Sequence, residues 1–369
     1  MTLHAYNQLQ NGDPITATLF NEMLDSQGRV INKGLYPISR PDYSIFKEDS
    51  TYYRRKSKTG LVDLYSESFA TVLTNTLSYG RCIELCGLSS SLVDFTLNDT
   101  VTIPKGVTIK SNPGSVRIKL ANGVNKDMFV VSDTTGDQYD YVWLDGLHLD
   151  GNRTNQTSGK GVVLKNITHS WITNCSIRDC RDYNIHAEST SGGNVYLNNW
   201  LLGTNGTNLY LEGTDDNVLN NWVGYGVNYG IFSDGNRHKI LGNHVWEQSG
   251  PAIFLSSNLH TVSYNVIEKI TGIGIEVNGH TNIVGPNQIV VEGGKAPTIG
   301  IKLDNTYSDY NQLIGNNIVG CTQQGILIGT GDQYNIVLGN ILRSCPTGQE
   351  LVDNGSNNEK AHNIIVGST

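Results

Sequence analysis

Several features that define other protein classes are missing from this chain of 369 residues. No apolar run approaches the ~18 residues that a membrane-spanning helix requires. Residues 1–8 have neither a basic start nor an apolar core, so no secretory signal is expected. Acidic residues outnumber basic ones by 34 to 26. The resulting net charge of −8 argues against a nucleic-acid partner, because phosphate binding requires a basic face.

Cysteine is also scarce. Six cysteines in a chain of this length do not indicate a disulfide scaffold. Cys82 and Cys86 have no His or Cys partner at the spacing of a zinc site. The sequence therefore predicts neither a metal site nor a cofactor.

Glycine, in contrast, is abundant at 41 residues, and the chain repeats itself. Seven tetrads with a small or turn-forming residue, then an apolar, a variable and a mostly apolar residue, begin at Asn184, Asn208, Gly230, Ala252, Gly274, Gly300 and Gly325. An asparagine follows each tetrad, at Asn199, Asn221, Asn243, Asn265, Asn287, Asn316 and Asn340. The first five asparagines are 22 residues apart, and the next steps are 29 and 24 residues.

A period in this range indicates a solenoid, and short alternating segments between Gly and Asn indicate strands. The sequence therefore predicts an all-β fold, a parallel β-helix with one coil per period, in right-handed coils over residues 161–345. Side chains alternate along a strand, so Ile185, Leu209, Ile231, Ile253, Ile275, Ile301 and Ile326 should form one buried row. The asparagines should lie at a bend, where their amides bond to each other and to the turn backbone.

Two cysteines fit the same repeat. Cys321 and Cys345 each lie five residues after a repeated asparagine, which places them on adjacent coils. We expect a reduced, buried pair at this position. A disulfide between them is possible but not required.

The chain divides into three parts. Residues 1–65 differ from the repeat and are expected to form a separate leader segment, with a short amphipathic helix over residues 12–25. Residues 50–59 are the only basic run, expected to be a solvated linker, with docking to an acidic partner as the alternative. Residues 66–160 should hold a helix over 66–77 that covers the first coil, followed by irregular coils. Regular β-helix is expected over residues 161–369.

Two stretches resemble known proteins. Residues 69–73, 82–85, 101–109 and 144–152 resemble the entry to pectin-lyase-like right-handed β-helices. Residues 6–21 resemble the leaders of tail proteins of tailed viruses. Together they resemble a tailspike, a small particle-binding head on a β-helix that handles host surface glycans. The resemblance implies a homotrimer, attachment to other virion tail proteins through residues 1–65, and location in the virion tail. Without it, a cytoplasmic protein remains the alternative.

No catalytic motif of that family transfers residue by residue. Asp215 and Asp216 resemble the paired aspartates of polygalacturonases, but they follow the tetrad strand and are predicted to lie in a turn. The companion Gly-His-Gly motif is missing, and residues 278–281 are only a partial match. Lyase chemistry would require clustered calcium carboxylates and an arginine, and no arginine falls on the tetrad face.

The outward positions of the tetrad strands are more informative. Their third position reads Val163, His186, Tyr210, Phe232, Phe254, Glu276 and Lys302 along the axis. Their fifth position reads Lys165, Glu188, Glu212, Asp234, Ser256, Asn278 and Asp304. Outward Phe has no role in the core, so it either stacks on sugar or is covered by another chain.

These columns give a candidate site for glycoside hydrolysis. Three carboxylates stacked ~4.8 Å apart repel one another, which should raise at least one pKa. Glu212 is the middle of the three and is the predicted general acid, with Asp234 or Glu188 as nucleophile or base. Tyr210, Phe232 and Phe254 would stack on sugar rings, and His186 would assist proton transfer. A hydrolase or lyase of host surface polysaccharide, a non-catalytic receptor binder and a structural virion protein all remain open.

Overall fold

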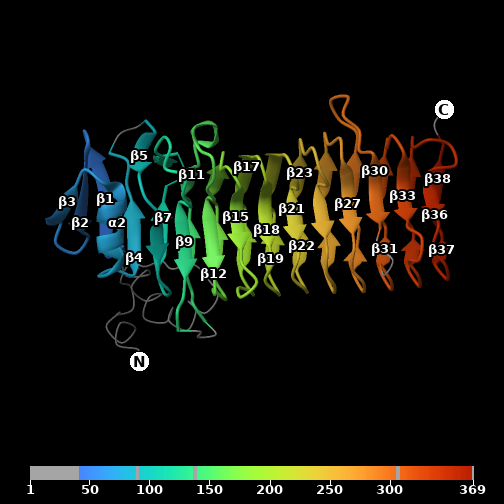
Figure 1. Ribbon diagram of the computed structural model, residues 1–369, viewed down its shortest axis with the longest axis horizontal. Coiled ribbons are helices and arrows are strands. Elements are labelled where there is room, and N and C mark those ends of the chain that lie inside the picture. The colour runs from blue at the N-terminus through green and yellow to red at the C-terminus, as the bar shows by residue number, and fades with distance from the viewer. Residues whose placement is uncertain (1–40, 89–90, 113, 136–138, 305–307, 368–369) are drawn as a thin grey trace, which may run out of the picture.

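The computed structural model describes residues 41–367, except 89–90, 113, 136–138 and 305–307. The described chain is a long rod of stacked coils, with the N-terminal strands at one end (Figure 1). The helix expected over residues 12–25 lies outside the described residues.

Three sheets run along the rod, and each coil adds one strand to each of them. Sheet A has 15 strands: β1 Tyr43–Glu48, β2 Thr51–Lys56, β3 Val62–Ser66, β4 Cys82–Leu85, β7 Thr108–Ser111, β10 Trp143–Asp145, β13 Trp171–Thr173, β16 Val195–Leu197, β19 Asn217–Leu219, β22 Lys239–Leu241, β25 Thr261–Ser263, β28 Ile283–Val284, β31 Gln312–Ile314, β34 Ile336–Leu338 and β37 Glu359–Ala361. Sheet B has 12: β5 Val93–Leu97, β8 Val116–Leu120, β11 His148–Asp150, β14 Ser176–Arg178, β17 Trp200–Thr204, β20 Trp222–Gly226, β23 His244–Trp246, β26 Val266–Glu268, β29 Gln288–Val290, β32 Asn317–Val319, β35 Ile341–Arg343 and β38 Ile364–Val366. Sheet C has 11: β6 Val101–Ile103, β9 Phe129–Ser132, β12 Val162–Lys165, β15 Tyr183–Ala187, β18 Thr207–Leu211, β21 Ile231–Ser233, β24 Ile253–Leu255, β27 Ile273–Val277, β30 Ile299–Leu303, β33 Gln324–Ile328 and β36 Leu351–Asp353.

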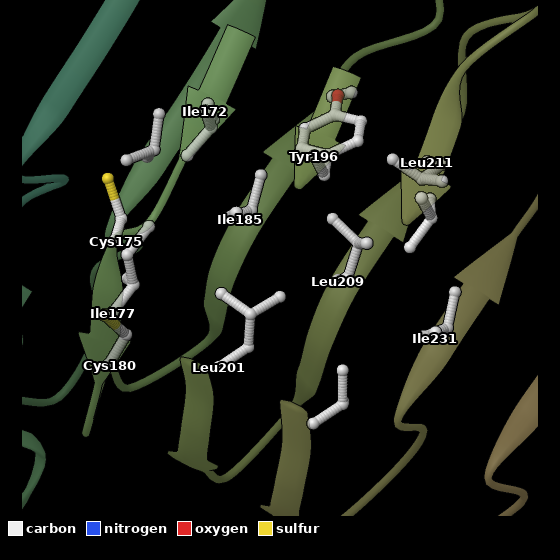
Figure 2. Close-up of a cluster of buried hydrophobic side chains, with 14 of the residues drawn as sticks. Ile172, Cys175, Ile177, Cys180, Ile185, Tyr196, Leu201, Leu209, Leu211 and Ile231 are labelled. Carbon is white, nitrogen blue, oxygen red and sulfur yellow. The ribbon is translucent and has the colours of Figure 1, made fainter. Parts of the chain in front are cut away.

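The predicted inner row is confirmed. Ile185 pairs with Leu209 on the next coil, Leu209 with Ile231, and the register continues unbroken to Ile326. All seven side chains of this row are fully buried. Figure 2 shows the same stacking for core residues of all three sheets, including Ile172, Leu201 and Tyr196. A single coil cannot bury such a row alone, so the coils stabilise one another.

The repeated asparagines form an asparagine ladder at the turn between sheets A and B, running from Asn199 through the later members to Asn363. The Asn221 amide illustrates its geometry. Its Oδ1 accepts from the backbone N–H of Asn199 at 2.9 Å, and its Nδ2 donates to Asn243 Oδ1 at 3.0 Å and to the Tyr196 carbonyl at 2.9 Å. The expected amide-to-amide bonding at a bend is therefore confirmed.

A second row of buried polar side chains, the mixed ladder, lies at the turn between sheets C and A. Its members are Ser170, Asn194, Asp216, His238, His260, Asn282, Asn311, Asn335 and Asn358. Backbone N–H groups again donate to the next side chain, from Ser170 to Asn194 at 3.0 Å, Asn194 to Asp216 at 2.8 Å, His238 to His260 at 3.2 Å, and onwards from His260 to Asn358. The three neighbouring rungs Asp216, His238 and His260 are therefore titratable groups, whereas the later rungs are amides.

Residues 41–77 contain more regular structure than the sequence suggested. Helix α2 (Phe69–Leu77) matches the predicted helix, and Ser68 caps it by accepting from the Thr71 N–H at 3.3 Å. Residues 50–59 were expected to be a linker, and this was wrong. They contain β2, which pairs antiparallel with β1 and β3 and buries Tyr52 and Arg54. The run of basic residues did not indicate this strand, because too few apolar residues alternate along it.

The coils also begin nearer the N-terminus than the regular 22-residue period of the sequence does. Strands β4 to β11 already occupy all three sheets, although their spacing in the sequence varies. The 29-residue step contains an extra antiparallel bridge between Glu292 and Lys295, in a loop between β29 and β30. Strand register is fixed by backbone pairing, so extra residues at a corner leave the stack unchanged.

The predicted cysteine pair lies on adjacent coils. Cys321 and Cys345 follow the paired residues Val319 and Arg343, and both are buried free thiols. A hydrogen bond between the two thiol groups raises the pKa of Cys321 and lowers that of Cys345. Burial also raises the pKa of Cys175 to about 12, so this core thiol is unreactive.

Candidate functional site

The two predicted columns lie side by side on the outer face of sheet C. Strand pairing brings His186 opposite Tyr210, Tyr210 opposite Phe232, and Phe232 opposite Phe254. The backbone N–H groups of Glu188, Glu212 and Asp234 bond to successive coils in the same way, at 2.9, 2.9 and 2.7 Å. The sequence therefore placed all seven predicted residues on adjacent rungs of one face.

His186 is the centre of a charged chain of contacts. Lys160 Nζ lies 2.8 Å from His186 Nδ1, and His186 Nε2 lies 3.2 Å from Glu212 Oε1. An ammonium group has no acceptor, so Nδ1 must accept from Lys160 and Nε2 must donate to Glu212. Burial and the Lys160 charge lower the pKa of His186, which agrees with this neutral tautomer.

Tyr210 connects the second acid to the column. Its hydroxyl donates to Asp234 Oδ2 at 3.2 Å, and Ser256 Oγ donates to Asp234 Oδ1. Burial, followed by the charges of Glu212 and Asp234, raises the pKa of Tyr210. Glu212 and Asp234 are thus each held by a donor side chain, whereas the sequence argument expected the acids chiefly to face one another. Glu188 is half-buried at the end of β15.

The aromatic rings largely cover one another. His186 and Tyr210 stack at 5.0 Å and 8°, and Tyr210 and Phe232 at 4.7 Å and 10°. Phe254 is tilted by 47° against Phe232. Both faces of Tyr210 are occupied, so a ligand on this face would meet its ring edge and hydroxyl group.

Other predicted residues flank the column. Lys302 pairs with Asp304 and lies 3.7 Å from Glu276, as an ion pair further along the rod. Burial raises the pKa of Glu276. Asp215 lies in a turn with a left-handed backbone and binds Arg237 through two bonds of 2.7 and 2.8 Å, as the sequence predicted for a turn. Asp216 instead enters the mixed ladder and is fully buried.

Sequence reasoning missed three residues of this face. Lys160 precedes the first tetrad-like strand, and Tyr183 and Tyr229 lie three residues before His186 and Phe232. The Tyr183 ring is tilted by 48° against the His186 ring at a centroid distance of 5.2 Å, and Lys160 Nζ lies 5.5 Å from the Tyr183 centroid. Tyr229 stacks on Phe254 at 5.1 Å. Extending the tetrads by one residue upstream would have revealed both tyrosines.

Comparison with protein families gives one match. Residues 120–291 match the family described as periplasmic copper-binding protein (NosD). Within the described part of the chain, no three His, Cys, Asp or Glu side chains are grouped to hold a metal ion. His238 and His260 are buried and bonded within the mixed ladder. The residues present therefore do not fit a copper site. No curated protein sequence matches the chain.

Solved structures resemble most of the chain. The A-module of the mannuronan C-5 epimerase AlgE6 of Azotobacter vinelandii has a TM-score of 0.52 at 15% identity, over 77% of this chain and 90% of that one. ORF18 of Geobacillus virus E2 has a TM-score of 0.54 at 12% identity, over 86% and 68%. The Streptococcus pneumoniae surface protein and adhesin PfbA has a TM-score of 0.50 at 10% identity, over 80% and 94%.

At these identities the likeness concerns the fold. The chain is a right-handed parallel β-helix with pectin-lyase-like architecture, as the sequence resemblance implied. Its described helices include none long and apolar enough to cross a membrane.

Proposed function

We propose that this protein binds a host surface polysaccharide along the outer face of sheet C and cleaves it there by acid–base chemistry. The observation that carries the proposal is the linked set Lys160, His186 and Glu212, next to Tyr210 and Asp234. It joins two carboxylates to a histidine, a lysine and a phenol along the outer face of sheet C, where Asp234 is exposed and His186 is buried. Structural packing alone does not require a lysine and a carboxylate at the two ends of one imidazole.

The roles follow from the contacts. Glu212 is held by His186 and serves as general acid, and Asp234 or Glu188 serves as nucleophile or base. Adjacent rungs are ~4.8 Å apart, close to the ~5 Å separation of the two carboxyl groups in retaining glycosidases. Lys160 would instead neutralise a uronate carboxylate if the reaction is a β-elimination. Tyr210, Phe232 and Phe254 contact the sugar through exposed edges.

The biological setting is part of the same proposal. The leader resemblance and the likeness in fold to a viral protein support a tailspike-like component of a virion tail. Residues 1–65 would attach it to other tail proteins, and the β-helix would form a homotrimer. The epimerase and adhesin neighbours support a glycan or cell-surface ligand for this fold, although fold alone does not give function.

The decisive experiment incubates the purified protein with envelope polysaccharide from candidate hosts and sizes the products. New reducing ends without unsaturated sugar ends indicate a hydrolase, whereas new reducing ends together with unsaturated sugar ends indicate a lyase. Glu212→Gln removes the ionisable group with little change in shape, so cleavage should fall at least ~10²-fold while binding survives. Asp304→Asn is the matched control, because it changes a carboxylate at the same strand position several coils away. Equal cleavage by Glu212→Gln and the wild type would refute the assignment.

A non-catalytic receptor-binding protein is the second candidate. The stacking of His186, Tyr210 and Phe232 favours it, because rings that cover each other also form a rigid, passive surface. Such a protein would retain the polysaccharide without shortening it, whereas a structural virion protein would do neither. If Phe232→Ala dissociates an oligomer, the column is an interface between subunits and the site lies elsewhere.

A further inference from the structure

A second group of aromatic rings lies beside sheet A, at its corner with sheet C. Tyr139 and Tyr141 are parallel within 9° at a centroid distance of 5.7 Å, and Tyr141 and Trp171 within 10° at 6.0 Å. Tyr139 and Tyr141 are 54% and 39% exposed. Stacked rings contact at ~3.5–4 Å between planes, so these distances mean that each ring is slid sideways over the next. Tyr139 and Tyr141 therefore offer exposed ring surface to a ligand, whereas Tyr210 is only half-exposed.

A cleft adjoins this aromatic row. It has a volume of about 420 Å³, within the ~300–1,000 Å³ of small-molecule sites. Its lining is Thr168, His169, Ser189, Thr190, Ser191, Gly192, Gly193, Thr214 and Asp215. The His169 ring lies 4.7 Å from that of Tyr139 and so connects the row to the cleft. Gly193 has a left-handed backbone, and a side chain there would contact the His169 ring at 3.5 Å.

The lining selects for a neutral, hydroxyl-rich ligand. Hydroxyl groups both donate and accept, which matches the hydroxyl groups of a sugar ring. Among the lining residues, Asp215 is the one Asp, Glu, Lys or Arg, and its two hydrogen bonds to Arg237 neutralise its charge, so the lining offers an anionic ligand no free cation. Exposed aromatic rings suit the apolar C–H face of a sugar. We propose that this cleft and the aromatic row form a second glycan site that binds an uncharged sugar residue.

This site is separate from the acid–base strip on sheet C. It uses neither Glu212 nor His186, and its position after Glu188, at the end of β15, puts it around the corner from that strip. A glycan held here would be anchored whether or not sheet C carries chemistry. The inference therefore goes beyond the proposed function and can stand without it.

The chain contains a matched control. Tyr310 and Tyr334 also stack, at 5.3 Å and 11°, and both are exposed. Like Tyr141, each has a left-handed backbone and lies two residues before a strand of sheet A. Asn357 occupies the same position on the last coil, so asparagine is compatible with this backbone. Tyr141→Asn and Tyr310→Asn are thus equivalent changes, of which only the first touches the proposed site.

The test titrates the full-length protein with maltohexaose, cellohexaose and chitohexaose as neutral probes and with trigalacturonate as an anionic probe, following tryptophan fluorescence and saturation-transfer NMR. At least one neutral probe should bind more tightly than trigalacturonate. Tyr141→Asn should weaken it at least ~10-fold, whereas Tyr310→Asn should change it less than ~2-fold. Asp215→Asn should reduce the discrimination against trigalacturonate.

Three results would overturn the inference. They are no binding by any neutral probe, equal weakening by Tyr310→Asn, or a binding loss in Phe254→Ala that Tyr141→Asn does not share. The last result would assign the bound sugar to sheet C. Thermal midpoints of all variants, measured beforehand, separate a lost contact from a lost fold, and Tyr139→Ala provides a second removal of a ring in the row.

Discussion

The asparagine ladder and the mixed ladder solve the same problem with different chemistry. Both run along the rod at a turn and pair buried backbone N–H groups with side chains of the next coil. In the asparagine ladder every described rung from Asn199 to Asn363 is an amide. In the mixed ladder Asp216, His238 and His260 replace amides at the middle coils.

The difference lies in how a rung donates and accepts. An amide does both at once at any pH, whereas a carboxyl or imidazole group does so in one protonation state. His238 accepts from Ser233 Oγ at 2.7 Å and donates to the Gly213 carbonyl at 2.9 Å, which requires the neutral ring. Asp216 Oδ2 has no partner among the described residues. On the preceding coil, Asn194 Nδ2 donates to a backbone carbonyl at the position that corresponds to Asp216 Oδ2. The Asp216 side chain can donate in the same way only when its carboxyl group is protonated.

Breaking the asparagine ladder should have the largest effect. Asn243 accepts from the backbone and side chain of Asn221, and donates to the Val218 carbonyl and to Asn265. Asn243→Leu leaves buried groups unpaired at ~1–3 kcal/mol each, so the unfolding free energy should fall by about 3–5 kcal/mol. Urea unfolding at pH 7 measures this, and Asn363→Leu on the last coil should cost less. A loss below ~1 kcal/mol would contradict the ladder's role.

Changing the two histidines to asparagine should alter the pH dependence of stability. Burial lowers the pKa of His238 to about 4 and that of His260 to about 3, against 6.5 for an ordinary histidine. Their contribution is therefore complete above pH 6.5 and is lost as the pH falls through 4. For each proton that the unfolded state binds and the folded state does not, the unfolding free energy falls by ~1.4 kcal/mol per unit of decreasing pH.

The variant to measure carries both His238→Asn and His260→Asn. Its denaturation midpoint should fall less between pH 7 and pH 4 than that of the wild type. Asp215 and Arg237 also act on His238 and remain unchanged in this variant. Parallel pH profiles of variant and wild type would show that the histidines do not set the acid sensitivity.

Asp216→Asn should increase the unfolding free energy, in contrast to the decrease expected for Asn243→Leu. Burial raises the pKa of Asp216 to about 7 from 3.8, so its stabilising effect is present below pH 4 and is lost as the pH rises to 7. The amide variant should be more stable than the wild type at pH 8 by about 1–3 kcal/mol. The difference should disappear near pH 4 in the same urea titrations. A destabilised variant at pH 8 would mean that the carboxylate has a partner that an amide cannot replace.

Arg237→Gln should have the smallest effect on stability. The pair of Arg237 with Asp215 lies directly outside the mixed ladder, and each side chain is 51% exposed. Exposed ion pairs contribute little, so the urea midpoint should not change measurably at moderate salt. A clear loss would mean that the surface pair, rather than the buried rungs, holds this corner together.

The repeat could be predicted from the sequence because burial and strand register require the same residue types at the same position of each coil. One apolar residue per coil, such as Ile231, and one amide per coil, such as Asn243, suffice to predict strands, coils and their alignment. Strand β2 was missed because only a short stretch of it is buried, at Tyr52 and Arg54. The titratable rungs were missed because the second ladder lacks a constant residue type.

The candidate site was predictable in position and less so in chemistry. Alternation along the strands placed Glu212 beside His186 within one coil, because the backbone fixes that distance. It did not reveal that Lys160 reaches His186, since a long side chain from an irregular segment carries no period. The aromatic row at Tyr139 and Tyr141 was invisible for the same reason, as both residues precede a strand and lie outside the tetrads.

The stacked coils also determine how long the native rod persists. An interior coil shares hydrogen-bonded strand edges and both ladders with two neighbours, whereas an outermost coil shares them with one. Opening from the middle must break two interfaces together, so loss of structure begins at the ends and advances coil by coil. The lifetime of the rod is then governed by its terminal coils. Helix α2, which covers the first coil, therefore slows the unfolding of residues far from it.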